Sequence, residues 1–306
     1  MESDRLNLPD TSVVTIDLLG HQLQFSQDPN SKHLGTTVWD ASMVFAKYLE
    51  RNSRKGRFCP SKLKGKRVIE LGAGCGVAGF GMAMLGCEVV TTDQKEVLPL
   101  LQRNVKRNTS RIMQAIANSD SFGSIKVAEL DWGNNDHIQA VDPPYDYVIG
   151  TDVVYAEHLL DPLLQTIHAL SGPRTTVVLG YEIRSTSVHE QMLQMWKNNF
   201  DVKTVPRTKM DIKYQHPSIQ LYLMGQKFSS GIALAADQEK KQAAEFLERE
   251  SNPREGKTSG VDEVGSEKND IGCSDSTGLS SRDLTDWEVR RCGAMAARLL
   301  RDVKIN

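Results

Sequence analysis

The sequence predicts an α/β fold with a seven-stranded, mostly parallel sheet, a C-terminal antiparallel hairpin and helices on both faces. Short apolar runs alternate with helical patterns over the first 228 residues, as in parallel strands joined by crossover helices. The apolar run at 68–71 carries an acid, Glu70, near its end and breaks into glycines, which is typical of a strand that turns sharply into a helix. The last two apolar runs are joined by a loop too short for a crossover helix, so they are expected to pair antiparallel at the sheet's edge.

The elements are expected in the following order. An N-terminal strand or hairpin occupies 13–25, and a helix follows at 37–51, with Trp39, Met43 and Ala46 on one face. The seven strands of the sheet are then expected at residues 67–71, 88–92, 125–130, 147–150, 176–179, 201–205 and 219–225.

Hydrophobic periodicity stops near Phe228, which predicts a folded domain at 1–228 and a mostly disordered tail at 229–306. The stretch 250–281 has few aliphatic residues and no period, so burial cannot offset its ordering entropy. The pattern returns at 283–302, where an amphipathic helix is expected. One interpretation docks this helix on its own domain, and the other has it bind a partner.

Composition excludes several classes of protein. The 37 basic and 39 acidic residues give a net charge of -2, so no overall field recruits nucleic acid or an anionic membrane. The five scattered cysteines form no C-x-x-C pair, which argues against a disulfide framework or a zinc site and favours the cytoplasm or nucleus. No secretory signal or long apolar run is evident, and no metal is expected.

The stretch VIELGAGCGVAGFG at 68–81 can be divided in two ways. Gly74, Gly76 and Gly79 fit the dinucleotide pattern G-x-G-x-x-G, with Asp93 at the distance of a ribose-binding acid. The alternative starts at Glu70, an acid followed by glycines at alternate positions.

The acid distinguishes the two interpretations. A carboxylate at Glu70 would repel a diphosphate, whereas it would attract the ammonium and sulfonium groups of S-adenosylmethionine. Asp93 can accept hydrogen bonds from ribose hydroxyls in either case, so it does not discriminate. The sequence therefore favours the methyl donor over a dinucleotide.

With its acid, this pattern resembles motif I of the class I, seven-strand S-adenosylmethionine-dependent methyltransferases, which have a Rossmann-like fold. Three further stretches, TVWDA at 37–41, LDW at 130–132 and DVVY at 152–155, resemble landmarks of the protein-lysine methyltransferases in the methyltransferase-like group. The resemblance spans about 13–228 and implies methylation of a protein lysine. Similar enzymes act on chaperones and AAA ATPases, as the valosin-containing-protein lysine methyltransferase does.

The resemblance also implies which residues bind the cofactor. Gly72 and Gly74 would line its methionine side, Asp93 would hold the ribose, Trp132 would lie against adenine, and Trp39 would close over the site. The full set of expected cofactor-binding residues is Trp39, Glu70, Gly72, Ala73, Gly74, Asp93, Trp132 and Thr151.

Asp152 and Tyr155 are the expected catalytic residues. Methyl transfer is an in-line displacement by a neutral amine, so the protein mainly orients and desolvates the reactants. Because a lysine has an ordinary pKa near 10.4, its amine must first lose a proton. Asp152 is expected to orient the amine, and the proton passes to Tyr155 or to water. The alternative role for Asp152 is to cap the helix after its strand.

These observations predict a cytoplasmic protein-lysine N-methyltransferase, also present in the nucleus, with a chaperone or AAA ATPase as substrate. A class I methyltransferase acting on a small molecule or on another side chain is the alternative enzyme. A non-catalytic adaptor that keeps the fold is the alternative from a different class. Loops at 182–189 and 207–218 are expected to select the substrate.

Overall fold

The computed structural model describes residues 12–115 and 122–227. They belong to the first of the two units into which the chain divides, Met1–Lys227. The tail and terminal helix predicted at 229–306 lie outside the described residues. In the described ranges, no helix has the length and apolar character needed to cross a membrane.

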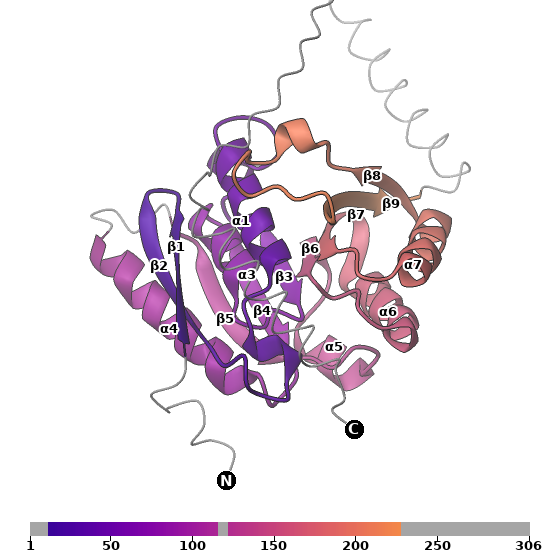
Figure 1. Cartoon of the computed structure of the whole chain (residues 1–306), viewed down its shortest axis with the longest axis horizontal. Helices are drawn as coiled ribbons and strands as arrows, with labels where there is room; N and C mark the ends of the chain where they lie inside the picture. The colour runs from indigo at the N-terminus through magenta and orange to yellow at the C-terminus, as the bar shows by residue number, and fades with distance from the viewer. Residues whose placement is uncertain (1–11, 116–121, 228–306) are drawn as a thin grey trace, which may run out of the picture. The chain divides into compact units, whose positions relative to one another are not determined.

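A seven-stranded sheet organises this unit (Figure 1). Its strand order is β5-β4-β3-β6-β7-β9-β8, and β9 runs antiparallel to both β7 and β8 while the other neighbours are parallel. The predicted sheet and its C-terminal antiparallel hairpin are confirmed. The strands are β3 (Arg67–Leu71), β4 (Glu88–Asp93), β5 (Ser124–Glu129), β6 (Tyr145–Thr151), β7 (Ser171–Glu182), β8 (Phe200–Thr204) and β9 (Ile219–Gln226).

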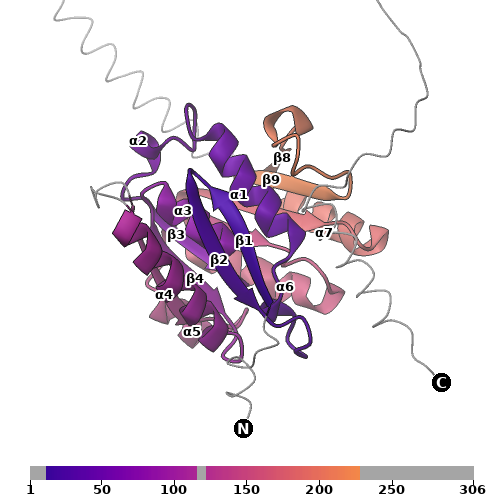
Figure 2. The ribbon, with the colours of Figure 1, turned by 60° about the vertical axis from the view of Figure 1, so that its left-hand side comes forward.

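Helices cover both faces of the sheet, as predicted. Figures 1 and 2 place α1, α3 and α4 on one face and α5, α6 and α7 on the other. The α-helices are α1 (Asp40–Asn52), α2 (Pro60–Leu63), α3 (Val77–Met84), α4 (Leu98–Ala115), α5 (Asn135–Ala140), α6 (Leu160–Leu170) and α7 (Thr186–Asn199), and short 3-10 turns lie at Leu34–Thr36, Glu157–Leu159 and Arg207–Lys209.

The expected N-terminal hairpin is present as β1 (Ser12–Leu18) and β2 (His21–Gln27), which pair antiparallel. Two asparagines of α4 fasten β2 by its main chain: Asn104 bonds both the N–H and the C=O of Ser26, and Asn108 does the same for Gln24. Because these amides satisfy the polar edge of β2, the hairpin is held on the domain without joining the main sheet.

One boundary differs from the prediction. The first helix begins at Asp40, and Trp39 precedes it in extended backbone as its N-cap residue, where it is half-buried. Trp39 therefore does not lie on the buried face of a helix. Its indole Nε1–H donates to the carbonyl of Leu34, 2.9 Å away, which orients the ring toward the segment before the helix.

The strand order locates the crevice in which a ligand is expected. The connections from β3 lead to β4 on one side, and β6 pairs with β3 on the other, so the order reverses between β3 and β6. In open parallel sheets, ligands bind outside the carboxyl ends of the strands at such a point. The predicted site residues Glu70, Asp93 and Thr151 lie at the carboxyl ends of β3, β4 and β6.

Candidate cofactor and substrate site

The glycine turn after β3 has a backbone that side chains rarely permit. Gly72, Gly74 and Gly76 have φ values of 56°, 57° and 86°, in the left-handed region. A Cβ on Gly74 would lie 2.8 Å from the carbonyl oxygen of Gly35, and one on Gly72 would lie 2.9 Å from Val153. The turn therefore approaches two other segments so closely that only glycine fits.

Asp93 ends β4 directly beside this turn. Its Oδ2 accepts the N–H of Gly74 at 2.7 Å, and its Oδ1 accepts the N–H of Gln94 at 2.8 Å. Burial raises the pKa of Asp93 to about 6, although both amides oppose the shift. The structure thus brings Asp93 and the glycine turn together, as predicted, beneath the segment that carries Gly35.

Glu70 is fully buried, under the first turns of α3. Its Oε2 accepts the hydroxyl of Thr91 at 2.5 Å and faces Gly79 so closely that a Cβ there would lie 2.2 Å away. Its Oε1 is buried without a hydrogen-bond partner among the described residues. Burial raises the pKa of Glu70 to about 7, because the hydrogen bonds from Thr91 and from the amide of Gly79 only partly offset the lost hydration.

This packing explains Gly79 without a diphosphate. In the dinucleotide pattern, the third glycine allows the helix to pack closely on the strand. Here the space beside Gly79 holds the Glu70 carboxylate. An acid between the strand and the helix would repel a pyrophosphate, so the geometry agrees with the second way of dividing the glycine stretch.

Trp132 forms a wall opposite the glycine turn. Its ring would lie 3.2 Å from a Cβ on Gly72, and it packs against the core cluster that contains Val153. The structure therefore brings together the turns after β3, β5 and β6, which are far apart in the sequence. Ala73, next to Gly72, is buried, and its N–H donates to the carbonyl of Thr92 on β4.

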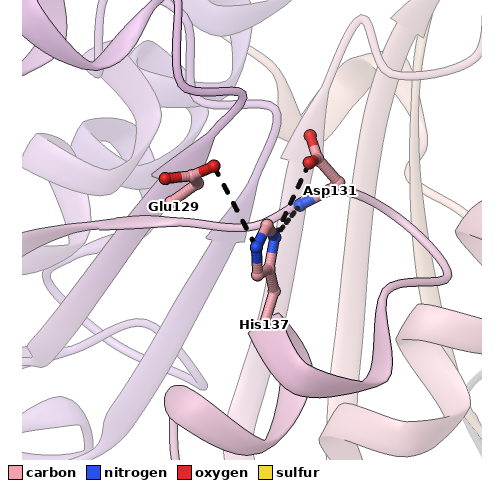
Figure 3. A group of neighbouring side chains, drawn as sticks. All are labelled: Glu129, Asp131 and His137. Atoms are coloured by element: carbon pink, nitrogen blue, oxygen red, sulfur yellow. Dashed lines mark hydrogen bonds and ion pairs between the residues drawn. The ribbon is translucent and has the colours of Figure 1, made fainter.

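Three half-buried polar side chains hold the turn that carries Trp132 (Figure 3). Glu129 and Asp131 lie on either side of His137, and their ligand atoms all lie within 4.8 Å of one another. Nδ1 of His137 accepts the N–H of Asp131 at 3.1 Å, so its lone pair is already engaged. We interpret this cluster as a brace for the turn at 131–137.

Asp152 follows β6 with φ at 57°, in the left-handed region, which is uncommon for a residue with a side chain. Its side chain is only 2% exposed. Oδ1 accepts the N–H of Glu182 at 3.0 Å, whereas Oδ2 is buried without a hydrogen-bond partner among the described residues. The next helical turn is capped by Ala156, so the alternative role of Asp152 as its cap is wrong.

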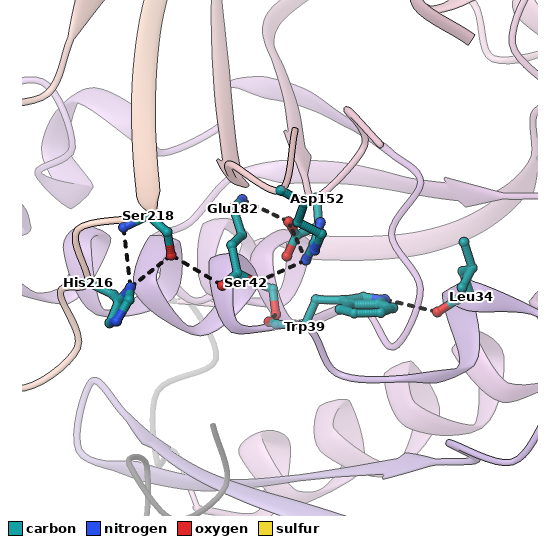
Figure 4. Close-up of polar contacts among 8 residues, drawn as sticks. Leu34, Trp39, Ser42, Asp152, Glu182, His216 and Ser218 are labelled. Carbon is teal, nitrogen blue, oxygen red and sulfur yellow. Dashed lines mark hydrogen bonds and ion pairs between the residues drawn. The ribbon is translucent and has the colours of Figure 1, made fainter. Parts of the chain in front are cut away.

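Arg184, just beyond β7, joins two carboxylates and a ring. One of its guanidinium nitrogens lies 3.2 Å from Oδ1 of Asp152 and 3.2 Å from Oε2 of Glu182, and its Cζ lies 5.0 Å from the centre of the Trp39 ring. Figure 4 shows Asp152 and Glu182 facing each other, with Trp39 extending toward Leu34.

The opposing charges set the ionisation of Asp152. Burial raises its pKa, whereas Arg184 and the amides of Glu182 and Ala41 favour the ionised form. Ala41 belongs to the first turn of α1, where partial positive charge also stabilises an anion. Thr151, the last residue of β6, is buried next to this acid.

Tyr155 is the most exposed of the predicted site residues, at 46%. Partial burial raises the pKa of its phenol, and the carboxylate of Asp93 raises it further. Because both effects raise the pKa, Tyr155 remains a neutral phenol near pH 7. This favours water over Tyr155 as the acceptor of a proton.

Sequence reasoning missed three contributors to this site: Gly35, Glu182 as a side chain, and Arg184. The position of Glu182 and Arg184 at the carboxyl end of a parallel strand is the signal that could have identified them, because ligand-binding residues gather at that edge. No local pattern indicates Gly35, since its contact with Gly74 joins segments 39 residues apart.

Comparison with known proteins finds similarity to lysine methyltransferases. A family model described as lysine methyltransferase matches residues 18–199. The chain is 36% identical over 188 residues to the protein N-lysine methyltransferase METTL21A of Danio rerio, covering 61% of this chain and 78% of that protein. It is 34% identical over 167 residues to the EEF1A lysine methyltransferase 3 of Mus musculus, covering 54% of this chain and 64% of that protein.

Proposed function

The chain belongs to the lysine methyltransferase family, and from that premise we propose how its residues methylate a protein lysine. It is an S-adenosylmethionine-dependent protein-lysine N-methyltransferase. We assign cofactor binding to the crevice around the glycine turn and orientation of the target amine to Asp152. One observation carries the second assignment: Oδ2 of Asp152 is buried without a hydrogen-bond partner among the described residues. Asp152 directly precedes Val153, whose side chain lies against Gly72.

The residues around the glycine turn fit S-adenosylmethionine. When bound, this cofactor supplies an electrophilic methyl group on a positively charged sulfur. Glu70 and Asp93 have no cationic side chain paired with them among the described residues, and Oε1 of Glu70 is unpartnered. A cationic nucleoside suits two such acids, whereas a diphosphate would add like charge. Asp93 would hold ribose hydroxyls, and Trp132 would offer a ring face to adenine.

Asp152 would receive the target lysine through Oδ2. A negative carboxylate favours the charged amine, so Asp152 docks and orients the lysine instead of taking its proton. The neutral phenol of Tyr155 would accept a hydrogen bond from the amine, and the proton would leave to water. The ring of Trp39 would help to exclude bulk water and present its face to positive charge.

For the substrate, we propose a chaperone or AAA ATPase of the cytoplasm or nucleus. Support comes from the resemblance of the motifs and from relatives named for protein substrates, one of them for EEF1A. A balanced net charge of -2 agrees with a protein in preference to a nucleic acid or a membrane surface.

The test is transfer of a labelled methyl group in a cell extract. The full chain and its Asp152→Asn variant are incubated with isotopically labelled cofactor, and modified residues are identified by mass spectrometry. We expect label on lysines of a few proteins, with chaperones, AAA ATPases and EEF1A added singly as purified candidates. Label confined to nucleic acid or metabolites would overturn the protein assignment, and binding of cofactor without transfer to any fraction would favour the adaptor.

A further inference from the structure

We propose that Arg184 is a positioning residue that keeps Asp152 ionised and fixes the Trp39 ring beside it. This inference rests on the proposed function, because it concerns how Asp152 is prepared to receive a lysine. It adds a residue that no motif of the sequence indicated. Its single guanidinium group contacts two acids and one indole ring.

The first step is the charge balance at the carboxyl ends of β6 and β7. Asp152 and Glu182 carry side chains that are 2% and 6% exposed. Two carboxylates at such close quarters disfavour each other's ionisation, and burial disfavours both. Arg184, which lies 3.2 Å from an oxygen of each, is the cation that both acids share.

The two carboxylate oxygens of Asp152 have different surroundings. Arg184 and the N–H of Glu182 both contact Oδ1 of Asp152, and Oδ2 has no hydrogen-bond partner among the described residues. The guanidinium therefore engages one oxygen and leaves the other for an incoming donor. A lysine amine can bind Oδ2 while Arg184 stays in place.

The guanidinium of Arg184 also contacts the indole ring of Trp39. The guanidinium lies over Trp39, with Cζ 5.0 Å from the ring centre, and the indole N–H is held by the carbonyl of Leu34 at 2.9 Å. A planar guanidinium stacks on an aromatic face and binds carboxylates with fixed geometry, which an ammonium does not. Arg184 thus links the end of β7 to the segment that precedes α1.

The groups that face Asp152 come from two elements, the end of β7 and the start of α1. Arg184 and Glu182 face it from the end of β7, and the amide of Ala41 faces it from the N-terminus of α1. Glu182 is in turn bonded by the hydroxyl of Ser218 at 3.2 Å, and Nδ1 of His216 lies 2.8 Å from that hydroxyl, which connects the loop before β9 to the pair (Figure 4). All of these groups affect the pKa of Asp152, directly or through Glu182.

The experiment compares Arg184→Met, Arg184→Lys and the wild type. Methionine keeps an unbranched apolar stem without the charge, and lysine restores the charge without the planar fork. The control is Arg111→Met on α4, since Arg111 is exposed and donates to Oε1 of Gln24 at 2.8 Å, outside the site. The readouts are kcat/KM against pH, the cofactor dissociation constant, and the carboxyl carbon-13 NMR titration of Asp152, assigned with Asp152→Asn.

We expect Arg184→Met to lower kcat/KM at pH 7 by about tenfold or more. The acidic limb of its pH profile should move up by about one pH unit, because an adjacent cation lowers a carboxyl pKa by about one to three units. The NMR titration should move in the same direction, Arg184→Lys should return most of it, and cofactor affinity should stay within about threefold of the wild type.

Coincident pH profiles and NMR titrations for Arg184→Met and the wild type would overturn the inference. An equal loss of activity in Arg184→Lys and Arg184→Met, with the Asp152 titration unshifted in both variants, would also overturn it. Failure of the proposed function is seen separately, as a wild type that binds the cofactor and methylates no protein. The NMR titration tests Arg184 even in that case.

Discussion

Two pairs of acids lie along one edge of the sheet, and they differ in how their charge is compensated. The cofactor half consists of Glu70 and Asp93, at the ends of β3 and β4, with the glycine turn between them. Burial raises the pKa of Glu70 to about 7 and that of Asp93 to about 6, and neither is paired with a cation among the described residues. The substrate half consists of Asp152 and Glu182, at the ends of β6 and β7, which share Arg184.

This difference in charge compensation indicates which half needs a positively charged ligand to balance its acids. In the cofactor half, ionisation is held back until positive charge arrives, so a cationic nucleoside would bind there and displace protons. In the substrate half, Arg184 already neutralises one charge, and Oδ2 of Asp152 has no hydrogen-bond partner among the described residues, which leaves it for the lysine that we propose binds there. The following variants test the contrast, from the largest expected effect to the smallest.

Asp152→Asn tests the substrate half, and we expect it to lower kcat/KM by about 100-fold, the scale of lost positioning. Asparagine is chosen because it tolerates the left-handed backbone at this position better than alanine. The measurement is steady-state methyl transfer, with cofactor affinity expected to stay within about threefold. Asp142→Asn, at a carboxylate that is 90% exposed and remote from the crevice, is the control. Equal activity in the two variants would contradict the role of Asp152.

Gly74→Ala tests the tight turn of the cofactor half. Its Cβ would meet the carbonyl of Gly35 at 2.8 Å in addition to the strain of a φ of 57°, and overpacking of this kind costs about 1 to 3 kcal/mol. We expect cofactor affinity, measured by calorimetry, to fall by about tenfold or more.

The matched control is Gly20→Ala, which has a φ of 79° but nothing within 4 Å of its new Cβ. It should lose about 1 kcal/mol of stability through strain and keep its cofactor affinity. Similar affinities for the two alanine variants would mean that the turn does not contact the cofactor.

Glu70→Gln tests two consequences of a buried, uncompensated acid, namely lower stability at high pH and attraction of a cationic cofactor. Because burial raises the pKa of Glu70 from 4.5 to about 7, the folded state retains a proton that the unfolded chain loses, and stability declines as pH rises through this window. The variant removes that penalty, so the free protein should gain about 1 to 3 kcal/mol at pH 8. Cofactor affinity should fall by about tenfold, since the variant lacks the negative charge that attracts a cationic cofactor to the neighbouring turn.

The control for this variant is Glu88→Gln, at the exposed start of β4. Denaturant unfolding at pH 5 and pH 8 gives the stability of each protein. A Glu70→Gln variant that is less stable than the wild type at pH 8 would contradict the absence of compensation for this acid.

Tyr155→Phe should have the smallest effect, lowering kcat/KM by about three- to tenfold, the worth of one hydrogen bond. The raised pKa of this phenol keeps it neutral below pH 10, so the alkaline limb of the profile should not move. A loss beyond about 100-fold, or displacement of that limb, would make Tyr155 the proton acceptor.

Much of the cofactor half was predictable from the sequence, because its determinants are local. The acid, the glycines and Asp93 lie at the ends of consecutive strands, and the carboxyl ends of parallel strands meet at one edge. The alternation of apolar runs likewise predicted the sheet and its antiparallel end.

The substrate half was only partly predictable. Asp152 stood out by its position after a strand, but its partners depend on the register of β7 and on the path of the segment before α1. Arg184 meets Trp39 across 145 positions of sequence, and the closeness of Gly35 to Gly74 depends on the same packing. Trp39 itself was expected on a helix, but it precedes α1 in extended backbone, and its indole N–H donates to the carbonyl of Leu34.

The most direct measurement is calorimetry of cofactor binding to the full chain near pH 6.5, in two buffers that differ in ionisation enthalpy. S-adenosylmethionine should bind with release of protons, because its positive charge lowers the pKa values of Glu70 and Asp93, and NAD should give no binding heat. Binding of NAD in preference to S-adenosylmethionine, or binding of S-adenosylmethionine with no change in bound protons, would contradict the assignment of this edge to a cationic methyl donor.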